Sequence, residues 1–280
     1  MKKPKILVIC GPTATGKSDL AVELAIERNG EIISADSRQV YKGLDVGSGK
    51  ITKKEMRGIP HYLLDVTSPK KVFSVNDYQR LATEKIKNIL SRGKLPIICG
   101  GTGFYIESIV DGIVLPEVKP NKELRKKLEE ESVENLFKKL KKLDGKRAKE
   151  IDKHNKVRLI RAIEIAEELG KVPKVKRIQK YNAEIIGLDT DDENLKDRIN
   201  RRLIKRVPGI IKEIKKLREN GLSWKRLESF GLEYRYGALY LQNKISKKEM
   251  IEKLNIEIWH YAKRQRTWFK RDKRIEWQNI

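Results

Sequence analysis

The stretch "CGPTATGKSDL" (Cys10–Leu20) decides the fold of this 280-residue chain. It follows the apolar run "KILVIC" (5–10) and precedes "KSDLAVELAIERN" (17–29), which repeats apolar residues at helical spacing. Residues 11–18 fit the pattern G-x-x-x-x-G-K-[ST] between a strand and a helix, which is the setting of a phosphate-binding loop. The sequence therefore predicts a phosphate or diphosphate site here.

The chemistry of this loop follows from its residue types. Glycines allow successive backbone N–H groups to point at phosphate oxygens, Lys17 adds a mobile charge, and the Ser18 hydroxyl can join the ligand shell of Mg²⁺. We expect Mg²⁺ as the cofactor, with Ser18 as its protein ligand. The residues predicted to bind the diphosphate are Gly11, Pro12, Thr13, Ala14, Thr15, Gly16, Lys17 and Ser18.

Strand and helix patterns alternate around the loop. Further buried strands are predicted at "EIISA" (31–35), "LPIICGG" (95–101) and "EIIGLD" (184–189), and a helix at "SVNDYQRLATEKIKNIL" (74–90). The first strands end at Gly11, Asp36 and Gly100, and ligands of such folds bind beyond the carboxyl ends of the strands. The pattern predicts an α/β fold: a P-loop NTPase-like parallel sheet core with a helical insertion and C-terminal helices.

The texture of the chain changes after about residue 112. "LPEVKP" (115–120) is a linker, and long Lys/Glu-rich helical patterns then run to about Val172. We therefore predict two domains: residues 1–112 with 183–280 form the core, and residues 113–182 form a helical insertion.

Positive charge is the strongest bulk signal. The chain has 63 Lys and Arg against 39 Asp and Glu, a net charge of +24, and the basic excess is concentrated in the middle and at the C-terminus. Such a field attracts polyanions such as nucleic acid or an acidic membrane surface, although a generally Lys-rich proteome would give the same count. The distribution favours a specific basic surface.

Other classes are excluded by composition. The longest apolar runs are far too short to span a bilayer, and the N-terminus lacks the pattern of a signal peptide, so we expect no membrane partner. Cys10 and Cys99 both end strand-like runs and are interpreted as buried, reduced thiols, which predicts a cytoplasmic location. No His/Cys cluster has the spacing of a zinc site.

The loop "SADSRQVYKGLDVGSGK" (34–50) is richer than phosphoryl transfer requires. Asp36 is a carboxylate at a strand end, as in a P-loop kinase, but Ser37, Arg38 and Gln39 follow it, and then Tyr41. Arg and Gln can hydrogen-bond a base edge, and Tyr can stack on a base. A solvated polar turn is the alternative interpretation.

Together these motifs resemble one family. "GPTATGKS" (11–18), "SADSRQVYKGLDVGSGK" (34–50), "IPHYLLD" (59–65), "GGTGFYI" (100–106) and "AKRQRTWF" (262–269) are similar in sequence and order to the tRNA dimethylallyltransferases, also called tRNA isopentenyltransferases. The resemblance implies that the loop binds dimethylallyl diphosphate with Mg²⁺. The five-carbon group would pass to the exocyclic amine of the adenosine 3′ to the anticodon of a tRNA, with diphosphate as the leaving group.

The resemblance also assigns residues by position. It implies that Asp36 is the base that takes the amine proton, that Lys17 and Arg235 stabilise the diphosphate, and that Thr102 lines the reaction channel. The insertion would bind the anticodon stem-loop through "VRLIRA" (157–162), although "DKHNKV" replaces the Asn-Asp-Pro turn that usually precedes this helix. The residues assigned to tRNA are Asp36, Ser37, Arg38, Gln39, Thr102, Arg125, Val157, Arg158, Leu159, Ile160 and Arg161.

Two further motifs have simpler interpretations. "DTDDEN" (189–194) could bind a metal, but acidic residues in the first turn of a following helix favour a helix start. Trp268 stands among basic residues of "KRQRTWF" (263–269) and could stack on a base, whereas the alternative is an amphipathic solvated helix.

Three functions are weighed on this basis. The tRNA prenyltransferase is favoured over a P-loop nucleotide or small-molecule kinase, since a kinase for small molecules has no need of a strongly basic surface. A non-catalytic RNA-binding module would not need the intact Lys17, Ser18 and Asp36. A monomer is the expected state.

Overall fold

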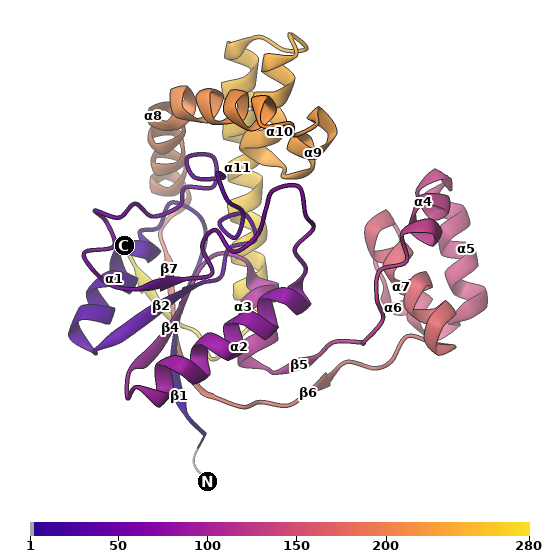
Figure 1. Cartoon of the computed structure of the whole chain (residues 1–280), viewed down its shortest axis with the longest axis horizontal. Coiled ribbons are helices and arrows are strands. Elements are labelled where there is room, and N and C mark those ends of the chain that lie inside the picture. Colours follow the sequence, from indigo (N-terminus) through magenta and orange to yellow (C-terminus); the bar gives the residue numbers. More distant parts are fainter. Residues whose placement is uncertain (1–2) are drawn as a thin grey trace. The chain divides into compact units, whose positions relative to one another are not determined.

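The computed structural model describes residues 3–280 (Figure 1). The strands are β1 Lys5–Cys10, β2 Gly30–Ser34, β3 His61–Tyr62, β4 Leu95–Cys99, β5 Ile113–Val114, β6 Lys176–Arg177, β7 Asn182–Asp189 and β8 Glu276–Asn279. The helices are α1 Lys17–Glu27, α2 Val75–Ser91, α3 Gly103–Val110, α4 Lys122–Glu130, α5 Val133–Leu143, α6 Gly145–Glu150, α7 Lys156–Leu169, α8 Asp192–Glu219, α9 Trp224–Ser229, α10 Leu232–Leu241 and α11 Lys247–Phe269.

A parallel sheet with the strand order β3-β2-β4-β1-β7-β8 forms the centre of the fold. The predicted α/β class is confirmed, because β1, β2, β4 and β7 are the strands expected from the sequence. Since β1 lies between β4 and β7 and all strands are parallel, the loops after β1, β2 and β4 leave the same edge of the sheet.

The apolar run of β1 is continuous because both faces of the sheet are covered. Ile6 and Val8 pack in a core with residues of α2 and α3, whereas Leu7 and Ile9 pack in a second core with residues of α1. Side chains alternate between the two faces of a strand, so a strand buried on both sides has no polar positions. This packing fixes the position from which the phosphate-binding loop begins.

Side-chain caps define several helix starts. At the start of α2, which was predicted from the sequence, Ser74 and Asp77 form a reciprocal capping box. Asp191 caps α8 by accepting the backbone N–H of Asn194, so "DTDDEN" is a helix start. Among residues 3–280, no group of His, Cys, Asp and Glu side chains has the arrangement of a metal cluster.

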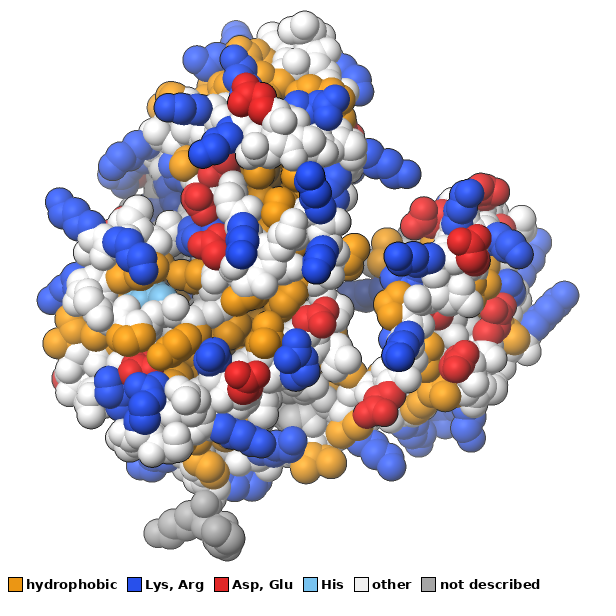
Figure 2. All heavy atoms as spheres, viewed as in Figure 1, with side chains coloured by type: hydrophobic (Ala, Val, Ile, Leu, Met, Phe, Trp, Pro, Cys, Tyr) orange, Lys and Arg blue, Asp and Glu red, His pale blue; other side chains and the backbone are white. Residues whose placement is uncertain are grey.

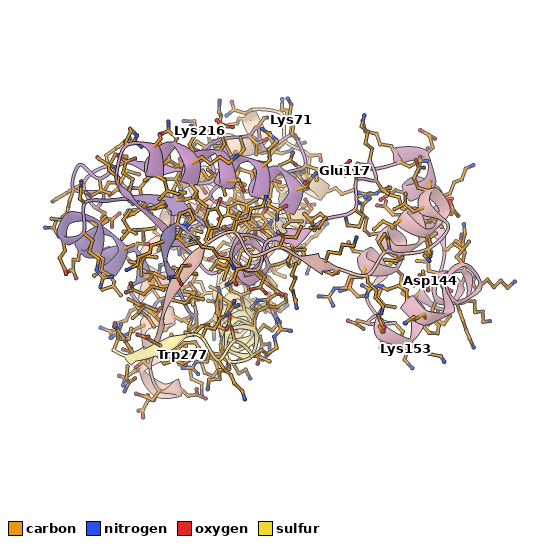
Figure 3. All side chains as sticks on the ribbon, turned by 90° about the horizontal axis from the view of Figure 1, so that it is seen from below. Lys71, Glu117, Asp144, Lys153, Lys216 and Trp277 are labelled. Atoms are coloured by element: carbon orange, nitrogen blue, oxygen red, sulfur yellow. The ribbon has the colours of Figure 1, made fainter. Side chains whose placement is uncertain are left out.

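The C-terminal helices α8–α11 have a core of their own. Residues of these helices pack with Val40, Tyr41 and Leu44 from the segment after β2. After these helices the chain returns to the sheet at β8, which pairs with β7. Trp277 of β8 (Figure 3) packs so closely on Gly187 of β7 that a Cβ at Gly187 would lie 2.8 Å from the indole ring. The segment after β2 is therefore held by the C-terminal helices rather than by the sheet.

The chain divides into two compact units. One extends to Gly112 and resumes over Gln179–Ile280; the other, Ile113–Ile178, contains α4–α7 and the antiparallel pair β5–β6. The second unit has its own apolar core around Leu136, Leu140 and Leu159. The boundary predicted between 182 and 183 falls one residue inside β7, because the sheet strand begins at Asn182.

The described part of the chain contains no helix that is both long enough and apolar enough to cross a membrane.

Candidate functional site

The loop between β1 and α1 has the backbone of a phosphate-binding turn. Gly11 has φ of +133°, and a Cβ there would lie 2.2 Å from the carbonyl oxygen of Leu188 on β7, so no side chain fits. Gly16 adopts the left-handed conformation and begins α1 without a side-chain cap. The N–H groups at the start of α1 are therefore open to an anion, and the helix dipole favours one there.

Lys17 and Ser18 complete this loop. The pKa of Lys17 is lowered from 10.5 to about 8, mainly by burial, and the positive charge of Arg202 contributes to this shift. The Lys17 ammonium donates to the carbonyl oxygen of Pro12, inside the loop. Ser18 is exposed in the first turn of α1. An anion in the loop would compensate the buried charge of Lys17.

Asp36 stands directly after β2 and is half-buried. Its Oδ1 accepts the backbone N–H groups of Arg38 at 2.7 Å and Gln39 at 3.3 Å, which fixes the carboxylate in a tight turn. No hydrogen bond to Oδ2 is found within residues 3–280. One oxygen therefore holds the turn, and the other remains able to accept a proton from a ligand.

Thr102 joins the loop after β4 to the loop after β2. Its hydroxyl accepts the backbone N–H of Ser37 at 3.0 Å, and its own N–H donates to the carbonyl of Ala35 at 3.0 Å. At Gly100 a Cβ would lie 2.3 Å from that same carbonyl oxygen, so close approach of the two loops requires glycine. The structure brings Asp36, Ser37 and Thr102 together.

The side chains of Arg38 and Gln39 are already engaged within the protein. Arg38 Nε donates to the carbonyl of Phe230 at 2.6 Å. Gln39 accepts the hydroxyl of Ser34 at 2.9 Å and donates to the carbonyl of Gly49 at 3.4 Å. The segment 36–39 is thus a preformed turn, and Arg38 also ties it to the C-terminal helices.

Two arginines of α8 were not predicted as site residues: Arg202 contacts the phosphate-binding loop, and Arg206 contacts the segment after β2. Arg202 donates to the Thr13 hydroxyl at 3.3 Å, and burial, with Arg206 nearby, lowers the pKa of Arg202. Arg206 Nε donates to the carbonyl of Val46 at 2.8 Å. Arginines spaced four apart share a helix face, and this spacing is the signal in the sequence that could have found them.

Arg235 does not contact the loop by hydrogen bond or ion pair in the described chain. It is exposed on α10. Glu233, two residues earlier, is the group that faces the α8 arginines, with 3.9 Å between its carboxylate and Arg206. Burial raises the pKa of Glu233. The assignment of Arg235 to the diphosphate stays a prediction, and Arg202 is the arginine that the structure places at the loop.

The last turns of α11 carry a groove of about 500 Å³ on their exposed face. Arg271 lies 4.1 Å from the centroid of the Trp268 ring, and Phe104 contacts the same ring edge-on. A Cβ at Gly103 would lie 2.2 Å from the indole, so the ring packs directly on the loop after Thr102. The groove is lined by His260, Lys263, Arg264, Thr267, Trp268 and Arg271.

In the unit Ile113–Ile178, two predicted RNA-binding arginines share one buried carboxylate. Arg125 donates to both oxygens of Glu164 at 2.8 and 2.7 Å, and Arg161 also pairs with Glu164. Burial alone would raise the pKa of Glu164, but the hydrogen bonds of the two arginines outweigh it and the net pKa is lowered. Arg125 and Arg161 therefore hold the unit together.

The predicted segment 157–161 is divided between core and surface. Asn155 caps α7 by accepting the N–H of Arg158, which settles where this helix begins. Leu159 and Ile160 are buried in the core of the unit, whereas Val157 and Arg158 are exposed. The side chains of Leu159 and Ile160 therefore cannot reach a ligand, whereas those of Val157 and Arg158 can. Figure 2 shows Lys and Arg side chains over the visible surface of this unit.

The donor set of the loop fits Mg²⁺ held mainly by a ligand. No cage of protein carboxylates exists in residues 3–280. Mg²⁺ usually retains waters and is bound through one or two protein oxygens plus substrate phosphates. The exposed Ser18 hydroxyl beside an anion-binding loop suits this mode.

Fold and site together define a P-loop α/β protein. Its phosphate-binding loop after β1 and its carboxylate turn after β2 lie at the same edge of the sheet. The profile of the IPP transferase family matches residues 39–272, and the chain belongs to this family. The resemblance drawn from the motifs is confirmed.

Relatives match over the whole length of the chain. It is 42% identical over 280 residues to the tRNA dimethylallyltransferase of Anoxybacillus flavithermus, which covers 98% of this chain and 89% of the relative. The tRNA dimethylallyltransferase of Thermoanaerobacter pseudethanolicus is 43% identical over 286 residues, covering 98% and 91%.

Solved structures share the fold. The full-length tRNA isopentenylpyrophosphate transferase of Bacillus halodurans matches with a TM-score of 0.75 at 39% identity, covering 99% of this chain and 90% of that one. A eukaryotic dimethylallyltransferase acting on tRNA matches with a TM-score of 0.82 at 27% identity, covering 99% and 74%.

Proposed function

We propose that this chain is an enzyme that transfers the dimethylallyl group of dimethylallyl diphosphate to the N6 amine of the adenosine 3′-adjacent to a tRNA anticodon, releasing diphosphate. Family membership and full-length similarity to tRNA dimethylallyltransferases support the reaction class. One observation carries the proposal for the site. The Asp36 carboxylate is fixed by one oxygen, its other oxygen is free of hydrogen bonds from the described residues, and its charge acts on Lys17 in the phosphate-binding loop.

The donor side stabilises the leaving group. As the bond between the allylic carbon and the diphosphate oxygen breaks, negative charge accumulates on the diphosphate. The N–H groups at the start of α1, Lys17 and Arg202, which lie at the phosphate-binding loop, would surround that charge in this proposal. Prepositioned donors of this kind typically contribute about 10²–10³ each to a rate. The buried charge of Lys17, with its lowered pKa, gains an anionic partner.

Ser18 would hold Mg²⁺ together with diphosphate oxygens. When bound, the ion supplies further charge stabilisation to the leaving group. The protein residues provide one hydroxyl and no carboxylate cage, so the ion and the diphosphate bind together in this proposal.

The acceptor side removes a proton. A carbon–nitrogen bond forms between N6 and the allylic carbon while the carbon–oxygen bond to diphosphate breaks. The N6 proton passes to the open oxygen of Asp36, whose other oxygen is held by Arg38 and Gln39 backbone N–H groups. Thr102 fixes the turn through Ser37. To reach Asp36, the adenine must leave its stack.

RNA would be recognised by both units. The groove on α11 combines Lys263, Arg264 and Arg271 with the Trp268 ring, which suits phosphates and an unstacked base. In the insertion, Arg158 offers an exposed charge for the anticodon stem-loop. One chain carries both loops, so we propose a monomer. The free, buried Cys10 and Cys99 agree with a reducing compartment, and we place the reaction in the cytoplasm.

The test is direct product detection. The protein is incubated with Mg²⁺, dimethylallyl diphosphate and unmodified tRNA, and the digested nucleosides are examined by mass spectrometry. We expect adenosine with one added five-carbon unit, and its loss with Lys17→Ala. Consumption of ATP without prenylated adenosine would instead support a P-loop kinase.

A further inference from the structure

Gln265 of α11 bridges the phosphate-binding loop and the loop after β4. Its Oε1 accepts the backbone N–H of Thr13 at 2.9 Å, and its Nε2 donates to the carbonyl of Gly101 at 2.9 Å. The side chain is only 6% exposed. A Cβ at Gly101 would lie 2.2 Å from Nε2, so the bridge requires glycine opposite it. Both ends of one amide are therefore used to set two loops at a fixed separation.

The helix that carries Gln265 is itself held firmly. Ala262 and Phe269, one turn to either side, are buried in the two apolar cores that α11 contacts. The neighbouring Arg266 pairs with Asp189 at 2.7 Å and donates to the backbone of Thr190, at the end of β7. Because this turn of α11 is fixed, the Gln265 amide is held in the position that bridges the two loops.

The same turn of α11 also forms the groove. Trp268, three residues after Gln265, packs on Gly103, and the intervening Thr102 fixes Ser37 of the carboxylate turn. Gln265 contacts the Gly100–Gly103 segment at Gly101, and Trp268 contacts it at Gly103. Trp268 in the groove is therefore connected through Gly103 and Thr102 to the carboxylate turn, and Gln265 on the same turn of α11 is hydrogen-bonded to the phosphate-binding loop.

We propose that Gln265 is a positioning residue that sets the phosphate-binding loop against the Gly100–Gly103 loop, and that this bridge couples RNA seated in the α11 groove to the affinity for diphosphate. The second part rests on the proposed function. Thr13 is held from two directions, by Gln265 at its N–H and by Arg202 at its hydroxyl. Loss of the bridge leaves the loop anchored on one side only.

The first experiment needs no RNA. Binding of inorganic diphosphate with Mg²⁺ is measured by calorimetry for the wild type and for Gln265→Met, which keeps the length of the side chain and removes both hydrogen bonds. We expect about tenfold weaker binding, in line with the loss of two buried hydrogen bonds. The matched control is Gln242→Met. The amide of Gln242 donates to Glu228 and to the carbonyl of Ala238 at the end of α10, and we expect its loss to leave the affinity for diphosphate unchanged.

A second variant attacks the bridge from the other side. Gly101→Ala places a methyl group against Nε2 and should reproduce the loss seen with Gln265→Met. In the double variant the losses should not add, because the bridge is broken only once. Additive losses, or diphosphate affinity unchanged in either folded single variant, would overturn the positioning role. Gly101→Ala keeps the test open should Gln265→Met fail to fold.

The coupling is measured by repeating the titration with an anticodon stem-loop RNA present. In the wild type we expect the RNA to tighten diphosphate binding at least fivefold, the lower range of typical couplings. In Gln265→Met the RNA should change it less than twofold, while the affinity for RNA itself stays within threefold. Full coupling in the variant would overturn this part. If the wild type fails to prenylate tRNA while the diphosphate titrations without RNA come out as expected, the proposed function is refuted and the positioning role stands.

Discussion

The carboxylate turn after β2 and the α7 segment of the insertion were both predicted as contiguous RNA-binding stretches, and they differ in kind. At residues 36–39 the backbone is bent into a turn, so consecutive side chains leave it in several directions, and the structure fixes Asp36 and Ser37 beside Thr102. At residues 157–161 the backbone is helical, and the side chains alternate between a core and a surface.

Because of this difference, the residues of a contiguous sequence motif do not all have to contact the same ligand. The turn is fixed by hydrogen bonds to one oxygen of Asp36, which leaves the other oxygen available for chemistry, whereas the side chains of Arg38 and Gln39 are engaged within the protein. A helix segment of five residues covers more than one turn, so some of its side chains must pack against the neighbouring helices. Leu159 and Ile160 do so, and Arg161 pairs with the buried Glu164. These three side chains contribute to the fold of the insertion, whereas Arg158 is exposed, and the assignment of the segment to RNA stays a prediction.

The largest expected effect tests the turn. Asp36→Asn retains an oxygen that can accept the N–H groups of Arg38 and Gln39, but it cannot take a proton. We expect the rate of transfer in single-turnover assays to fall by about 10²–10⁴, with affinities for RNA and diphosphate within threefold. Asp45→Asn, an exposed carboxylate that pairs with Lys50, serves as the control. A rate preserved in Asp36→Asn would show that the turn is only a scaffold.

The next test concerns the interior of the insertion. Glu164→Gln leaves two arginines without their carboxylate, and because each is 34% exposed we expect a loss of about 2 kcal/mol in stability rather than the larger cost of a fully buried pair. Hydrogen exchange of the α7 amides measures it. The control is Glu167→Gln, which breaks only the surface pair with Lys139 and should cost less than about 0.5 kcal/mol.

The contribution of Glu164 and its two arginines to stability depends on pH. Since the pKa of Glu164 in the folded state lies below its ordinary value of 4.5, its contribution is complete above that pH and is lost as the pH falls. Acid sensitivity of exchange in the insertion should therefore be smaller in Glu164→Gln. If the pH dependence of exchange is the same in Glu164→Gln as in the wild type, the two arginines and Glu164 do not stabilise the insertion as a unit. The α7 segment would then be less dependent on its buried contacts than the comparison with the carboxylate turn implies.

A smaller effect sharpens the description of the donor loop. The pKa of Lys17 is about 8 when no anion is bound, and an anionic ligand raises it. Above pH 8 the ligand-free loop loses this charge, so the apparent affinity for diphosphate should fall up to tenfold per pH unit. Calorimetry with Mg²⁺-diphosphate between pH 7 and 9.5 measures this, and Lys17→Met should remove the inflection. An inflection that persists in Lys17→Met belongs to another group.

Much of the core was predictable because its signals are local. The strands β1, β2 and β4, the phosphate-binding loop and the α2 capping box each follow from neighbouring residues. The strands β3 and β8 were not predicted, because β3 has two residues and β8, "EWQN" (276–279), is exposed throughout and is defined only by its pairing with β7.

The parts of the site that escaped prediction depend on long-range contacts. Arg202 and Gln265 reach the same loop residue, Thr13, from helices that lie about 190 and 250 positions later in the chain. Nothing near either residue in the sequence indicates that partner. In the insertion the signal was present: Leu159, Ala162 and Ile163 follow helical spacing, which predicts a buried stripe through the motif.

The smallest expected effect decides whether the exposed remainder of that motif binds RNA. Arg158→Ala removes one surface charge from α7 and should weaken binding of an anticodon stem-loop three- to fivefold, and lower the slope of affinity against salt by about one. Lys146→Ala removes an equal exposed charge from α6 and should weaken it less than twofold. Leu159→Ala should reduce affinity only as far as it unfolds the insertion, without changing the salt slope, because its side chain is in the core. Equal losses for Arg158→Ala and Lys146→Ala would mean that the insertion attracts RNA through its net charge alone, and that α7 contributes structure rather than contact.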